Sequence, residues 1–141
     1  MKNQFFILTF LLLFLATLNA QTIKSPSEFL GYEIGTRYTR HHMVVEYFQY
    51  IAQNSNSIKL EQYGKTNEHR PLYVSYISSE ENIKNLETIR EENLKRTGIL
   101  NGKSGSKTAI IWLSYNVHGN ETSSSEAAMQ TAYELVTTKQ E

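Results

Sequence analysis

Hydrophobic residues recur along the first half of the chain at spacings that predict a helix followed by a pair of strands. From about Thr39 to Gln53 the apolar residues fall every three or four positions, which marks one helix face: Val44, Tyr47, Phe48, Ile51 and Ala52. Residues 58–63 alternate between apolar and polar side chains, and residues 71–77 are rich in Leu, Tyr, Val and Ile. The short polar segment between the two runs predicts an antiparallel hairpin.

Helix start signals occur before and after this region. Ser25 precedes Pro26, and proline is favoured at the first position of a helix, so a short helix is expected there that ends at one of the next glycines. Ser78 and Glu81 have the spacing of a capping box, in which each side chain bonds the other residue's backbone. They precede a thin apolar stripe, which predicts a surface helix that stops near Gly98.

The last third of the chain contains a continuous apolar run at residues 108–114, which predicts an inner strand buried on both faces. Ser123 and Glu126 have the spacing of a second capping box, followed by a helical stripe to the end. The order of elements predicts an α/β sheet with helices on its faces. Three strands would leave the inner one near an open edge, so further strands are expected past residue 141.

The N-terminus has the pattern of a secretory signal peptide. Lys2 gives it a positive start, residues 5–15 are apolar apart from one threonine, and Ala20 is small enough for cleavage. The apolar run is shorter than the roughly 18 residues that span a bilayer, so no membrane span is expected. The predicted organisation is a signal peptide (1–20), a lead segment (21–38) and one domain portion (39–141). The predicted location is exported, periplasmic or extracellular.

Composition narrows the chemistry further. Without residues 1–20 the chain carries 13 Lys and Arg against 14 acidic residues, so no basic face favours nucleic acid as a partner. The chain has no cysteine, which excludes disulfides and lipidated cysteines. All 14 acidic residues are glutamate, so no Ser-His-Asp triad can be assembled from this chain. Glutamate and histidine must carry any catalytic chemistry.

His118 and Glu121 are the candidate metal ligands, in the loop between the predicted inner strand and the last helix. Loops at the carboxyl ends of strands in α/β sheets are where ligands collect, and imidazole nitrogen and carboxylate oxygen both suit zinc. Gly119 would permit a tight turn between them. A catalytic zinc commonly takes three protein ligands and a water, whose pKa it lowers towards neutrality. Only two ligands are evident, and a capping or hydrogen-bonded histidine is the alternative interpretation.

Two longer stretches resemble a known family. Residues 63–74 read YGKTNEHRPLYV and residues 112–121 read WLSYNVHGNE. They are similar, in this order, to the hairpin and the first metal-binding loop of the M14 zinc carboxypeptidases, and the resemblance extends from about Arg37 to the C-terminus. It departs at His69, where the family usually has glycine, and at Asn120, where pancreatic-type members have arginine.

The resemblance implies the N-terminal part of a mixed-sheet α/β domain flanked by helices. It also implies one Zn²⁺ ion held by His118, Glu121 and a histidine further downstream, with a downstream glutamate as general base. The implied substrate is a peptide or protein that loses its C-terminal residue. No catalytic base and no substrate-binding residue can be assigned within the chain, so the chain alone is expected to be inactive.

Two other functions remain open. His-Gly-Asn-Glu also occurs in zinc-dependent N-acyl amino acid deacylases, which would be a different reaction on the same scaffold. An exported module without catalytic activity is the third hypothesis, because two ligands hold zinc weakly.

Overall fold

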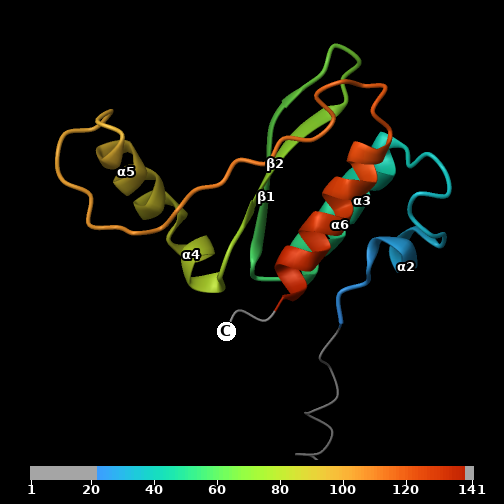
Figure 1. Cartoon of the computed structure of the whole chain (residues 1–141), viewed down its shortest axis with the longest axis horizontal. Helices are drawn as coiled ribbons and strands as arrows, with labels where there is room; N and C mark the ends of the chain where they lie inside the picture. The colour runs from blue at the N-terminus through green and yellow to red at the C-terminus, as the bar shows by residue number, and fades with distance from the viewer. Residues whose placement is uncertain (1–21, 139–141) are drawn as a thin grey trace, which may run out of the picture.

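The computed structural model describes residues 22–138, so the predicted signal peptide at residues 1–20 lies outside the described residues. Two long helices lie side by side, next to a two-stranded antiparallel sheet, and two further helices extend beyond the sheet (Figure 1). The elements within the described range are α2 (Pro26–Leu30), α3 (His41–Asn54), β1 (Ile58–Lys65), β2 (Pro71–Ile77), α4 (Glu80–Lys84), α5 (Leu86–Arg96) and α6 (Ser123–Thr137).

Helix α2 forms where Ser25 and Pro26 predict it. The Glu28 backbone N–H donates to Ser25 Oγ at 3.3 Å, and the Ser25 N–H donates to Glu28 Oε2 at 2.8 Å, which completes a capping box. Gly31 ends the helix with a φ of +74°, a left-handed conformation that glycine adopts without steric cost. Pro26 is buried, so the lead segment belongs to the packed part of the molecule.

The core lies between α3, α6 and β1. Tyr47 and Ile51 of α3 and Met129 of α6 have no exposed surface, and Ile58 and Ala132 are nearly as buried. Tyr47 and Ile51 are four positions apart, so the helical period places both on the face that meets α6. The predicted helix over residues 39–53 is confirmed within two residues at its start.

The predicted hairpin is confirmed as β1 and β2. Ile58 pairs with Ile77 at the open end, and the register shifts between Gln62 and Gly64, where a bulge places one extra residue in β1. His69 lies in the turn with a φ of +61°, so the position where the M14 resemblance expects glycine has a left-handed backbone, the conformation that glycine adopts without steric cost.

The predicted capping box of Ser78 and Glu81 is wrong by one residue. Ser78 still belongs to the sheet region, because its N–H donates to the Ser57 carbonyl at 3.0 Å. Ser79 caps α4 instead and accepts from the Asn82 N–H. The expected surface helix is also divided at Asn85, which ends α4 and precedes α5.

The predicted inner strand at residues 108–114 is wrong for the described structure. The segment has no regular secondary structure, and Ile111 and Trp112 are 80% and 79% exposed. The sheet of the described residues contains only β1 and β2, and residues 108–114 pair with neither of its outer edges. A strand needs a neighbour for its backbone groups, so the apolar run stays extended and solvated.

Helices α3 and α6, the largest of residues 22–138, are both amphipathic and belong to the core. None of the helices between residues 22 and 138 combines the length and the hydropathy that a membrane span requires. The combination of helices and an antiparallel sheet is that of an α/β fragment.

Candidate metal centre

His118 and Glu121 come together in the loop that leads into α6. His118 Nδ1 lies 3.0 Å from Glu121 Oε1, and the two side chains are 70% and 51% exposed. The Glu121 N–H donates to the His118 carbonyl at 3.1 Å, which closes a turn and holds both side chains on one side of it. The three-residue spacing predicted from sequence therefore places the two candidate ligands next to each other.

The separation of these two atoms is close to the one that zinc coordination requires. Tetrahedral coordination with usual Zn–N and Zn–O distances places neighbouring donor atoms about 3.4 Å apart. The observed 3.0 Å is within a few tenths of an ångström of that value. The donor set, one imidazole nitrogen and one carboxylate oxygen, also suits zinc. These two residues therefore fit the ion in type and in spacing.

The pair has two chemical states. With a proton on Nδ1, His118 donates a hydrogen bond to Glu121 Oε1, and only Nε2 has a free lone pair. With the proton on Nε2, the Nδ1 lone pair and the carboxylate face the same space, which is the arrangement that a shared cation requires. The high exposure of both groups makes their direct ion pair weak, because water screens it.

The loop is attached to α6 at both ends. Asn116 has a φ of +55°, and its Oδ1 accepts a hydrogen bond from Ser125 Oγ at 3.2 Å. The Ser124 N–H donates to the Glu121 carbonyl at 3.2 Å. The sharp left-handed residue is thus Asn116 and not Gly119, where an added Cβ would meet nothing within 4 Å. The turn does not depend on glycine in the way predicted.

The other histidines lie elsewhere. His41 and His42 begin α3, and His69 lies in the hairpin turn. Partial burial lowers the pKa of His41, and the positive charge of Arg70 lowers it further. Among residues 22–138, no three His, Cys, Asp or Glu side chains form a group that could hold a metal ion. His118 and Glu121 are thus the two candidate ligands that the structure brings together.

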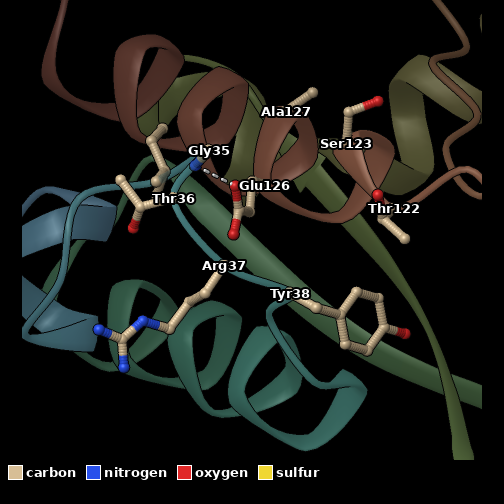
Figure 2. Close-up of a pocket in the computed structure, with 9 residues that line it drawn as sticks. Gly35, Thr36, Arg37, Tyr38, Thr122, Ser123, Glu126 and Ala127 are labelled. Carbon is tan, nitrogen blue, oxygen red and sulfur yellow. Dashed lines mark hydrogen bonds between the residues drawn. The ribbon is translucent and has the colours of Figure 1, made fainter.

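The predicted capping box of Ser123 with Glu126 is wrong. Thr122 occupies the N-cap position and makes no side-chain cap bond, while Glu126 is turned inward and is only 7% exposed. Its carboxylate lines a pocket of about 430 Å³ between the segment after α2 and the start of α6 (Figure 2). Its partners Gly35 and Thr39 are far away in the sequence, so local spacing gave no signal of this role.

The greater part of the chain matches a known protein family. A family model described as zinc carboxypeptidase matches residues 44–141, which is more than half of the chain. The chain belongs to the M14 zinc carboxypeptidase family. No curated protein and no solved structure matches it.

The M14 match covers both candidate ligands and most of the elements around them. It begins within α3 and includes the β1–β2 hairpin, the loop with His118 and Glu121, and α6. The M14 family is zinc-dependent in general, which agrees with the donor types of this loop. The lead segment and α2 precede the match but pack against the same core.

Proposed function

We propose that this protein is an exported metallocarboxypeptidase that releases C-terminal residues from peptides. The main support is the 3.0 Å approach of His118 Nδ1 to Glu121 Oε1 in a loop that lies inside the M14 match. Zinc, when bound, supplies Lewis-acid polarisation of a carbonyl and activation of water. Within this chain, His118 and Glu121 would hold the ion.

The two residues make different contributions. His118 provides a neutral nitrogen donor when its ring is deprotonated, and Glu121 provides a negative oxygen that offsets part of the charge of a divalent cation. Both are more than half exposed, so the end of a peptide can approach them from solvent. Asn120 lies between them in sequence and is exposed, which makes its amide available to a polar substrate group.

Zinc titration of the purified chain tests the ligand pair. The unmodified chain should bind one zinc weakly, and both His118→Ala and Glu121→Ala should abolish saturable binding, because a single ligand remains. His69→Ala is the matched control, since it removes an exposed histidine from the hairpin turn and should leave binding unchanged. If zinc still binds to His118→Ala and Glu121→Ala but not to His69→Ala, the metal site lies at the hairpin turn and not in the loop.

The reaction is tested on the zinc-loaded protein expressed from its native gene. We expect release of C-terminal amino acids from peptides, dependent on zinc and lost in Glu121→Ala. N-acyl amino acids assayed beside the peptides separate the two reactions that this scaffold could perform. Hydrolysis of N-acyl amino acids without release from peptides would replace the proposal by a deacylase.

We also propose that the 141-residue chain by itself does not turn over peptides. Two protein ligands hold zinc weakly, and a catalytic site usually has three. A pure preparation of the correct mass, assayed with excess zinc, should show no release above the buffer. Measurable turnover from that preparation refutes this part of the proposal.

Export is the remaining part and rests on the leader at residues 1–20. Expression in a bacterium with the leader intact should place the chain outside the cytoplasm, and deletion of the leader should retain it inside. An intact chain that is found only in the cytoplasmic fraction contradicts export.

A further inference from the structure

Glu126 is the one buried acidic residue of the described range. It is not one of the candidate ligands in residues 116–121, the segment called the metal loop below. A buried carboxylate is costly unless hydrogen bonds satisfy it. Its Oε2 accepts from the Gly35 N–H at 2.5 Å, and its Oε1 accepts from Thr39 Oγ1 at 2.6 Å. Thr39 is itself fully buried and lies 2.7 Å from the Tyr32 hydroxyl, which must donate to it because the Thr39 proton is already in use.

The partners of Glu126 are neutral donors. Figure 2 shows its carboxylate directed at the Gly35 nitrogen, while the Arg37 side chain extends away from it. The Arg37 guanidinium stands 4.5 Å from the centre of the Tyr32 ring instead. The contact is therefore directional, because two fixed hydrogen bonds and no mobile cation define where the carboxylate sits.

Glu126 belongs to the same helical turn that holds the metal loop. Ser124 binds the Glu121 carbonyl through its N–H, and Ser125 binds Asn116 through its hydroxyl. Three successive residues of α6 thus hold the end of the loop, its beginning and the Gly35–Thr39 segment. A change in the direction of this turn moves Glu121 relative to His118.

We propose that Glu126 is a positioning residue for the metal centre. By binding Gly35 and Thr39, it fixes the first turn of α6 and thereby the orientation of the Glu121 carboxylate towards His118. The inference rests on the proposed function, because it assigns Glu126 a purpose only if His118 and Glu121 hold a metal. Glu126 acts through the backbone of α6 and touches neither the metal nor the substrate.

Zinc titration of the full chain, combined with amide hydrogen exchange, tests this role. In Glu126→Ala we expect about tenfold weaker zinc binding, the lower end of the effect of residues that orient metal ligands, together with faster exchange of the Gly35 amide. Glu126→Gln should restore most of the affinity, since its amide oxygen can accept from Gly35 and its NH₂ can donate to Thr39 Oγ1. Glu134→Ala, an exposed change two turns along the same helix, is the control and should alter neither reading.

Two results overturn the proposal. One is a Glu126→Ala chain that melts at lower temperature yet binds zinc as tightly as the unmodified chain when folded, because Glu126 then only stabilises the fold. The other is a Glu126→Gln chain as impaired as the alanine variant. If Glu126→Ala does not fold, Thr39→Val removes one of the two hydrogen bonds at nearly constant shape and is judged by the same readings.

The failure of the proposed function has a separate signature. If the unmodified chain binds no zinc, the ligand pair fails and the metal-positioning role fails with it. The NMR chemical shifts of the backbone from Asn116 to Glu121 then decide whether Glu126 controls the shape of the loop. Shifts that change in Glu126→Ala and stay constant in Glu134→Ala uphold the control of the loop by Glu126. Shifts that are identical in both variants refute it.

Discussion

Two apolar regions of this chain have opposite environments. The facing sides of α3 and α6 place Ile51 and Met129 in full burial, whereas residues 108–117 hold Ile111 and Trp112 almost fully in solvent. Both regions are equally recognisable as hydrophobic in the sequence. The difference lies in the backbone, because a helix satisfies its N–H and C=O groups internally while a strand needs a partner. Hydrophobic pattern thus predicts which face seeks burial, and the available partners decide whether it is buried.

The exposed region is also where the candidate ligands begin. Val117 is 70% exposed and directly precedes His118, so the Ser125–Asn116 hydrogen bond, and not burial of Val117, holds the beginning of the loop. An extended apolar segment with free backbone groups is a template for pairing with another strand. Any strand that pairs with residues 108–114 would therefore also fix the approach to His118.

The largest expected effect on stability comes from a matched pair of isoleucine-to-alanine substitutions, one in each apolar region. Ile51→Ala should lower the free energy of unfolding by about 2–5 kcal/mol, because it removes buried methylenes and leaves a cavity between α3 and α6. Ile111→Ala should change it by no more than about 0.5 kcal/mol, as is usual for exposed positions. Urea denaturation followed by circular dichroism measures both values.

Equal losses in the two variants would contradict the comparison, since Ile111 would then be packed against something in the folded chain. Ile110→Ala, also more than half exposed, is the second control and should behave as Ile111→Ala does. A loss confined to Ile51→Ala sharpens the boundary of the core.

Elements whose signals are local were predictable from the sequence. The stripe of α3, the alternation of β1 and the Ser25–Pro26 start of α2 each depend on neighbours within a few positions. Contacts between distant segments left no such signal. Glu126 accepts from Gly35, 91 positions away, and this contact replaces the capping box that its local spacing suggests. The predicted cap at Ser78 is also wrong because of a contact between distant residues: the Ser78 N–H donates to the Ser57 carbonyl, which keeps Ser78 next to the sheet.

The candidate site divides in the same way. His118 and Glu121 lie three residues apart, so one turn brings them together and the sequence sufficed to pair them. The residues that hold this turn were not predicted. Asn116, and not Gly119, takes a left-handed conformation, and its side chain has Ser125 as a partner that only the folded α6 supplies. The ligand role of the pair remains a prediction.

A smaller, local effect is expected at Glu92, where the exposed segment is attached to α5. Glu92 Oε2 accepts from the Gly105 N–H at 2.6 Å, and hydrogen bonds from Lys95 and from Gly105 lower the pKa of Glu92 to about 2. A lowered folded-state pKa means that this contact stabilises the loop fully above the ordinary glutamate pKa near 4.5 and is lost as the pH falls towards 2. The protection factor of the Gly105 amide should fall across that window.

The matched controls lie on the same helix. Glu92→Gln should show low Gly105 protection at every pH, since the charged acceptor is gone. Glu87→Gln removes a carboxylate that pairs with Arg90 and does not reach the loop, so the pH profile of Gly105 should stay as in the unmodified chain. Protection of Gly105 that is independent of pH in the unmodified chain would exclude Glu92 as its anchor.

The smallest expected effect is at Trp112, the only tryptophan of the chain, which reports directly on the exposed region. Because Trp112 is 79% exposed, acrylamide should quench its fluorescence nearly as efficiently as that of a free indole. Trp112→Phe should leave the free energy of unfolding within about 0.5 kcal/mol. Quenching that is several-fold weaker, with emission shifted to the blue, would show that residues 108–114 are covered. The contrast between the two apolar regions would then vanish, because the side chains of both would be packed against other parts of the folded chain.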